Sequence, residues 1–196
     1  ELIGNYVSSG MLDGQFDFNL YFDARSVLVN DQESFQKLSN SLHESFSYYG
    51  YNHMMGNITG NHDMARFISY AGEGLRFDEE SQSAGWERDI KVENPIGYKK
   101  LSMLIAFNMT IPGIPVIYYG DEYGMPGAGD PDNRRPMQFK NLSEDEIQTK
   151  ILTEKLVKLR KNNIALTFGS FNEVLVEDKV YVYYREYLDQ IVLVVM

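Results

Sequence analysis

The sequence predicts an α/β fold in which parallel strands alternate with crossover helices, followed by a short antiparallel β region. Three observations predict it. Short apolar runs alternate with longer stretches whose apolar residues recur at helical spacing over most of the first 163 residues. After residue 169 the pattern changes to three β-type runs separated by polar turns. The 196 residues, of which 43% are hydrophobic and 23% charged, have the composition of an ordinary globular protein.

The first β–α unit is predicted over residues 12–50. Its strand is the run from Leu12 to Leu20, and a possible capping box at residues 30–33 precedes its helix. The helix is expected to end near Gly50. One apolar face is expected from Phe35, Leu38, Leu42 and Phe46.

The second unit is predicted to start with a strand at His53 to Thr59, buried on both faces. Its helix begins only at Pro95, with a buried stripe of Tyr98, Leu101, Leu104, Ile105 and Ala106. The intervening residues 68–94 form a Gly-, Glu- and Ser-rich excursion that is longer than a purely structural connection requires. We expect this excursion to border a site, although a tolerated surface insertion has the same length signature.

The third unit is predicted as a strand at residues 114–119, a Gly- and Pro-rich stretch at 120–136 and a helix ending at Asn162-Asn163. Ser143-Glu144-Asp145-Glu146 is a capping box that opens this helix. Its apolar face is expected from Ile147, Ile151, Leu152, Leu156 and Leu159. We therefore predict two domains: residues 1–163 form the later part of a barrel, and residues 164–196 begin an antiparallel β domain.

Three β–α units cannot close a (β/α)8 barrel, which needs eight strands. The chain begins at Glu1 without a start methionine and ends at Met196 within a predicted strand. We therefore expect part of a longer protein, about strands 6 to 8 of a barrel with their helices. The alternative is a small open sheet, complete in itself, with helices on both faces.

Charge and composition exclude several classes of function. The formal net charge of −10 is spread through the chain and would repel phosphate backbones, so no nucleic-acid partner is expected. The composition also argues against a membrane protein. Cysteine is absent, which excludes disulfides and thiolate zinc sites but does not assign a compartment.

Candidate site residues follow the second predicted strand, because barrel chemistry lies where strands end. Gly60-Asn61-His62-Asp63 offers an amide, an imidazole and a carboxylate in succession, all able to bind hydroxyl groups. A capped turn with a surface histidine, or a metal pair of His62 and Asp63, are the alternatives.

The segment after the third predicted strand combines tyrosines, acids and arginines over residues 118–136. Tyrosine rings stack on sugar faces, while Asp and Arg bind sugar hydroxyls, so this composition suits carbohydrate. A salt-bridged surface loop is the alternative. Trp86 and Tyr123 are candidates for outer sugar subsites or, equally, for packing anchors.

Three motifs in order resemble the α-amylase superfamily. Residues 12–18 (LDGQFDF) resemble its sixth barrel strand, residues 60–63 (GNHD) the end of its seventh, and residues 113–122 (GIPVIYYGDE) its eighth. The terminal β runs are similar to the family's C-terminal β-sandwich domain. The three motifs at these separations are highly specific together and span essentially the whole chain.

The resemblance implies a role for each site residue. Asp63 matches the catalytic carboxylate that binds hydroxyls of the sugar at the cleavage point and helps distort it toward an oxocarbenium-like transition state. His62 matches a neighbour that binds the same sugar, and Asn61 supports the turn. Asp130 and Arg134 resemble an acid and a base of the same subsite in the neopullulanase and cyclomaltodextrinase branch.

The resemblance also implies a retaining mechanism that needs a nucleophilic aspartate and a glutamate acid/base. In the family these lie on the fourth and fifth strands, which are not among these residues, and Glu1 does not match either. We therefore expect the chain to be inactive in isolation, with α-glucan and the missing N-terminal barrel half as its partners. This segment requires no cofactor and offers no metal site, although the resemblance allows a calcium ion in the parent protein.

Two further functions stay open at this stage. A non-catalytic relative would use the same barrel as a scaffold or a carbohydrate-binding surface. A transglycosylase or isomerase would use the same covalent intermediate while excluding water. The sequence does not distinguish α-1,4 from α-1,6 bonds.

Overall fold

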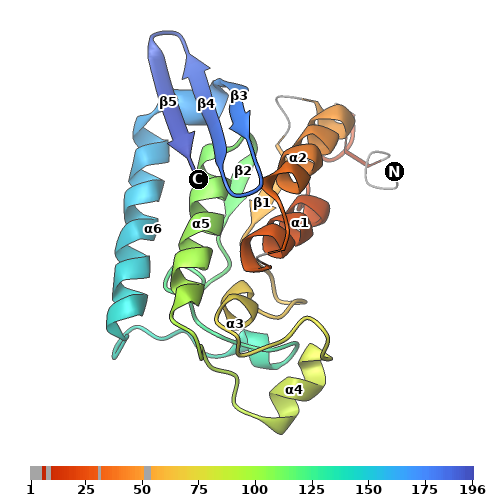
Figure 1. The fold of residues 1–196 in the computed structure, drawn as a ribbon, viewed down its shortest axis with the longest axis vertical. Coiled ribbons are helices and arrows are strands. Elements are labelled where there is room, and N and C mark those ends of the chain that lie inside the picture. The colour runs from red at the N-terminus through yellow and green to blue at the C-terminus, as the bar shows by residue number, and fades with distance from the viewer. Residues whose placement is uncertain (1–5, 8–9, 31, 51–53) are drawn as a thin grey trace. The chain divides into compact units, whose positions relative to one another are not determined.

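A computed structural model describes residues 6–7, 10–30, 32–50 and 54–196 (Figure 1). It divides into two compact units, each of which is considered by itself. Unit 1 contains residues 1–58, 107–116 and 157–196, and unit 2 contains residues 59–106 and 117–156. The chain passes from one unit to the other four times, and two of these points lie within the long helices α5 (Ile96–Thr110) and α6 (Glu144–Asn162).

Unit 1 begins with two neighbouring helices, α1 (Phe18–Val29) and α2 (Phe35–Tyr49). The strand predicted from Leu12 to Leu20 is wrong in its second half. The Asp17 side chain accepts a hydrogen bond from the Leu20 amide at 3.1 Å and one from the Ser45 hydroxyl, so it starts α1 there. The helix predicted after residue 33 is confirmed as α2, with Ser34 as its N-cap.

Parallel pairing in unit 1 joins β1 (Gly56–Ile58) to β2 (Ile114–Val116). On its other edge, Gly56 forms an isolated parallel bridge with Phe16, so three segments far apart in the chain lie in parallel order. Gly113 precedes β2 with φ of +103°, and a Cβ there would lie 2.9 Å from the carbonyl oxygen of Met55. The first residue of the predicted second strand, His53, lies outside the described residues.

The C-terminal part of unit 1 is a short helix, α7 (Ile164–Phe168), and a three-stranded antiparallel sheet. The strands β3 (Ser170–Val176), β4 (Tyr181–Tyr187) and β5 (Gln190–Val195) pair in the order β3-β4-β5. Alternate residues of β4, Tyr181, Tyr183 and Arg185, are buried. The predicted antiparallel region is therefore present, while its assignment to a separate domain of residues 164–196 stays a prediction.

Unit 2 contains α3 (Phe67–Ala71), α4 (Ser81–Glu87), the 3-10 helix η2 (Asp132–Arg134) and most of α5 and α6. The long excursion between the second strand and its helix is a packed structure. It buries a small core that consists of Ala65, Leu75, Ala84, Ile90 and Ala128. The helix predicted from Pro95 is confirmed as α5, with Leu101, Leu104 and Ile105 buried.

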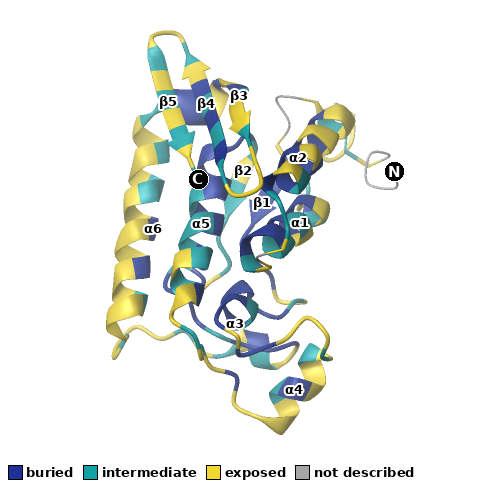
Figure 2. Cartoon of the chain, in the orientation of Figure 1, coloured by how far each residue is buried: buried dark blue, intermediate teal, exposed yellow. Residues whose placement is uncertain are grey.

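The capping box of α6 is confirmed, because the Ser143 amide donates to Glu146 Oε2 at 2.7 Å and the Glu146 amide donates to Ser143 Oγ at 3.3 Å. The apolar residues predicted to form one face of α6 are not buried, and the helix is exposed along most of its length (Figure 2). Its buried residues are Thr149 and Thr153. Their hydroxyls donate to backbone carbonyls of Asp145, Thr149 and Glu122.

Candidate functional site

The turn that follows β1 presents two polar side chains to solvent. Asn61 is buried, and its side-chain oxygen accepts a hydrogen bond from the Asp63 amide at 2.9 Å, which forms an Asx turn. The side chains of His62 and Asp63 are 60% and 67% exposed. His62 Nε2 lies 3.3 Å from Asp63 Oδ1, so both groups can reach one ligand.

The loop after β2 brings a second pair of predicted residues to the same turn. Arg134 Nε lies 2.9 Å from Asp130 Oδ1 and donates to the backbone carbonyl of His62 at 3.2 Å. Arg134 Nη2 lies 3.9 Å from Asp63 Oδ1. The structure therefore brings together all five predicted site residues of unit 2: Asn61, His62, Asp63, Asp130 and Arg134.

The chemistry of this cluster suits a polyhydroxylated ligand. The carboxylates of Asp63 and Asp130 accept hydrogen bonds, while the guanidinium of Arg134 only donates them. A sugar hydroxyl both donates and accepts, so alternating acceptors and donors can bind adjacent hydroxyls. The arginine also partly neutralises two carboxylates that would otherwise repel each other.

The alternative of a metal site at His62 and Asp63 is not supported by the geometry. Among the described residues, no group of three or more His, Asp or Glu side chains is arranged to hold a metal ion. The guanidinium of Arg134 near Asp63 adds a positive charge that disfavours a cation at that carboxylate.

The two aromatic candidates differ in exposure. Tyr123 is 1% exposed, its hydroxyl lies 3.1 Å from Met125 Sδ, and it accepts a hydrogen bond from the Gln138 amide at 3.2 Å. Burial raises its pKa. Tyr123 is therefore a packing anchor. Trp86, on α4, is 73% exposed and remains available for a ligand.

A buried ion pair that no sequence pattern predicted lies near the turn. Arg66 and Asp121 are 1% and 2% exposed, and Arg66 Nη1 lies 2.9 Å from Asp121 Oδ1. Burial raises the pKa of Asp121 to about 6, against the opposing effects of Arg66 and the Thr59 hydrogen bond. A single arginine in the otherwise uncharged run from Met64 to Ile68 is the sequence signal that could have identified it.

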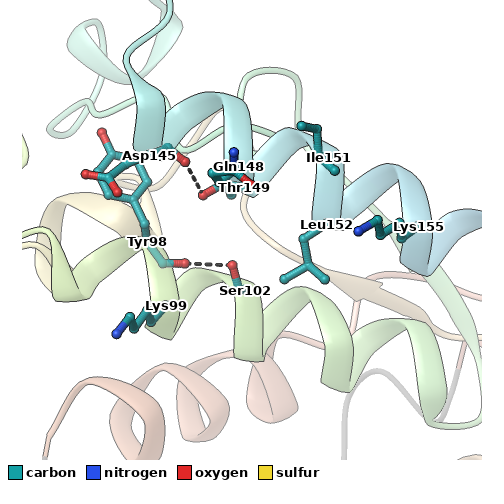
Figure 3. A pocket seen from close by; sticks show the side chains of 9 residues that line it. All are labelled: Tyr98, Lys99, Ser102, Asp145, Gln148, Thr149, Ile151, Leu152 and Lys155. Atoms are coloured by element: carbon teal, nitrogen blue, oxygen red, sulfur yellow. Dashed lines mark hydrogen bonds between the residues drawn. The ribbon is translucent and has the colours of Figure 1, made fainter.

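Unit 2 also has a groove between α5 and α6 (Figure 3). None of the candidate sugar-binding residues lines it. Its volume is about 430 Å³, and Ile151 and Leu152 line it together with Tyr98. The hydroxyls of Ser102 and Thr149 donate to carbonyls of their own helices at 2.8 Å. Charged side chains of Lys99, Asp145 and Lys155 also line the groove, so its lining is partly apolar and partly polar.

Parallel β–α segments, with polar residues gathered after two adjacent strands, define the chain as part of a (β/α)8-barrel protein. The family described as "Alpha amylase, catalytic domain" matches residues 1–164. The chain belongs to this family, so the resemblance and the predicted fold class are confirmed. The solved structures that this chain resembles are α-amylase barrel proteins, so the alternative of a small open sheet is wrong.

Known relatives include a cyclomaltodextrin glucanotransferase of Geobacillus stearothermophilus, 30% identical over 180 residues, which are 91% of this chain and 21% of that protein. A cyclomaltodextrinase of Thermoanaerobacter pseudethanolicus is 32% identical over 148 residues, 74% of this chain and 21% of the relative. The chain thus spans about a fifth of these relatives. The α-amylase of Geobacillus thermoleovorans, solved with acarbose, superposes with a TM-score of 0.75 and 27% identity over 94% of this chain and 36% of that one.

No helix within the described part of the chain is both long and apolar enough to cross a membrane.

Proposed function

We propose that this chain contributes the sugar-binding and transition-state-stabilising part of the site of a retaining α-glucan-cleaving glycoside hydrolase. The observation that carries the proposal is the exposed pair of His62 and Asp63 beside the Asp130–Arg134 ion pair. The names of the relatives, cyclomaltodextrinase and cyclomaltodextrin glucanotransferase, support an α-glucan substrate. The acarbose complex of a 27% identical α-amylase supports the same substrate class.

Each residue has a distinct role in this proposal. Asp63 accepts hydrogen bonds from hydroxyls of the sugar at the cleavage point, and these bonds strengthen as the ring flattens toward an oxocarbenium-like transition state. His62 binds the same sugar, and Asn61 holds the turn through its bond to the Asp63 amide. Arg134 and Asp130 bind hydroxyls of the same subsite.

The covalent steps of retention require two further carboxylates about 5 Å apart, a nucleophile and an acid/base. We assign neither to any of these 196 residues, so the chain by itself should not cleave glucans. Its proposed partner is the remaining part of the barrel. The exposed apolar residues of β2 and α6, among them Ile114, Ile147 and Ile151, support packing against such a partner.

No step assigned to these residues needs a metal ion or cofactor, because binding and electrostatic stabilisation are made by side chains. A calcium ion bound by the complete protein would, in this proposal, take its ligands from other segments of the barrel. We also propose that residues 164–196 begin a separate β domain. Independent unfolding of that domain in the complete protein would support this boundary.

The experiment compares three samples on a malto-oligosaccharide: the 196-residue chain, a protein with the complete barrel, and its Asp63→Asn variant. We expect reducing ends only from the complete protein, with turnover lost in the variant. Release of reducing ends by the isolated chain would contradict its inactivity. Near-normal turnover of the variant would contradict the role of Asp63.

A second candidate function is transglycosylation, which the glucanotransferase relatives favour. Product analysis separates the two, because a hydrolase releases linear reducing products and a cyclising transferase releases cyclic ones. Binding of the oligosaccharide by the complete protein without any cleavage would instead favour a carbohydrate-binding scaffold.

A further inference from the structure

Arg66 lies three residues after Asp63 in the chain, and its buried side chain makes four hydrogen bonds. Its Nη1 donates to Asp121 Oδ1 at 2.9 Å and to the backbone carbonyl of Tyr119 at 2.7 Å. Its Nε and Nη2 both donate to the carbonyl of Asn133, at 3.1 and 2.9 Å. One side chain thus joins three points of the loop that follows β2.

The same contacts continue to the turn that carries the candidate sugar-binding side chains. Asn133 is fully buried, and its Nδ2 donates to the carbonyls of His62 and Met64 at 2.8 and 2.9 Å. On the other side of the turn, Thr59 Oγ1 donates to Asp121 Oδ2 at 2.6 Å. The turn is therefore tied to one loop both before His62 and after Asp63.

Stability alone does not account well for this arrangement. A buried ion pair loses much of its Coulombic gain to desolvation, and apolar residues of similar size are often equally stabilising. Apolar residues cannot reproduce the directional hydrogen bonds that this arginine makes. The planar guanidinium has its donors in a fixed fork, and it lies 4.6 and 4.9 Å from the ring centroids of Tyr118 and Tyr119.

We propose that Arg66 and Asp121 are positioning residues that, with Asn133, set the placement of His62 and Asp63 against the bound sugar. This inference rests on the proposed function of those two side chains. Positioning matters for turnover because a displacement of about 1 Å at a catalytic group can cost about 100-fold in rate. None of the three residues needs to touch the sugar.

The test uses the protein with a complete barrel and a defined malto-oligosaccharide substrate. The double variant Arg66→Met/Asp121→Leu replaces the ion pair with apolar side chains of similar size. We expect it to fold with a lowered melting temperature, because the carbonyls of Tyr119 and Asn133 lose their donors, while kcat of the folded protein falls about 10- to 100-fold. Arg66→Lys keeps the charge but loses the fork, so kcat should fall in this variant as well.

The matched control is Arg160→Lys, which changes another arginine bound to backbone carbonyls, in unit 1. It should lower the melting temperature and leave kcat unchanged. A folded double variant with the kcat of the parent would overturn the inference. So would an unfolded double variant, because the pair would then be required for folding rather than for placement.

A second readout does not depend on turnover. Histidine-selective ¹⁵N labelling reports the environment of the His62 ring, and we expect its signal to shift or broaden in the folded double variant. An unchanged His62 signal would count against positioning. If the parent protein cleaves no glucan at all, the proposed function fails, while a shifted His62 signal would still support the effect of the ion pair on the turn.

Discussion

Arg134 Nε lies 2.9 Å from Asp130 Oδ1, four residues earlier in the same loop. Both side chains are about half exposed, so the pair contributes little to folding stability. The pair matters because it fixes the position of the Arg134 guanidinium. The same guanidinium donates to the His62 carbonyl and lies near Asp63, so one arginine joins two candidate parts of a sugar subsite.

Replacing Arg134 should therefore affect substrate binding more than folding. In the protein with a complete barrel, Arg134→Gln should raise KM about 10-fold, because it removes a charge-assisted hydrogen bond worth about 1.5 to 3 kcal/mol. Steady-state kinetics on malto-oligosaccharides measure this change. The neighbouring variant Arg135→Gln breaks ion pairs with Asp132 and Asp89 and should leave KM near the parent value. Equal KM values for both variants would argue against a subsite at Arg134.

Replacing Asp63 should affect turnover instead. Asp63→Asn removes the negative charge opposite the developing oxocarbenium ion and should lower kcat by about 100- to 1000-fold, with a smaller effect on KM. The control is Asp78→Asn, since Asp78 is 80% exposed and pairs only with Arg76 among the contacts described. A variant that raises KM without lowering kcat would reduce Asp63 to a ground-state binding residue.

The raised pKa of Asp121 predicts a pH-dependent stability. Because burial raises the pKa of Asp121 in the folded state to about 6, from an ordinary value of 3.8, the folded state binds this proton more tightly. The contribution of Asp121 to stability therefore falls as pH rises, by roughly 1 kcal/mol between pH 5 and pH 7. Urea unfolding of the parent and of Asp121→Asn at both pH values measures it. A stability difference that is independent of pH would contradict the assignment.

Arg160 predicts a stability effect in unit 1. Its guanidinium donates to the carbonyls of Met109, Ile111 and Gly113 at 2.8, 3.2 and 2.7 Å, and burial lowers its pKa to about 10. Arg160→Met leaves these carbonyls at the end of α5 without their donors and should cost about 2 to 4 kcal/mol. Chemical denaturation measures the loss. Lys161→Met, at the next and exposed position, is the control and should change stability by less than about 0.5 kcal/mol.

The exposed face of α6 predicts self-association of the isolated chain. Ile151 and Leu152 are 39% and 38% exposed beside the groove between α5 and α6. Substituting both with lysine should reduce association of the 196-residue chain, as measured by light scattering or sedimentation. Gln148→Lys, which changes a polar residue of the same groove, should have little effect. Equal association of both variants would exclude this face as the cause.

The helices were easier to predict than the strands, for a physical reason. The apolar spacing of α2 and the capping box of α6 are local patterns, and both are present in the structure. The run from Leu12 to Leu20 suits a buried strand or a buried helix equally well. The hydrogen bonds that the Asp17 side chain accepts from the Leu20 amide and the Ser45 hydroxyl decide in favour of a helix from Phe18. The bond to Ser45 joins residues 28 positions apart, so it is not a local pattern.

The candidate site was predicted in the same uneven way. The order of residue types at 60–63 and 130–134 and the resemblance to the α-amylase superfamily were sufficient to select Asp63, His62, Asn61, Asp130 and Arg134. Their function stays a prediction, whereas their proximity is visible in the structure. The pairing of Arg66 with Asp121 was not predicted, because no local sequence pattern indicates which distant residue pairs with a buried charge.

By itself, the sequence determined the family, the alternation of strands and helices and the residue types available to bind a sugar, because these are properties of local order. Tertiary structure alone decided that Tyr123 is a packing residue, that the apolar face of α6 is exposed and that Arg66 pairs with Asp121. Each of these depends on contacts between residues distant in the chain. Burial and pairing are set by which surfaces meet in three dimensions, and one chain segment does not contain that information.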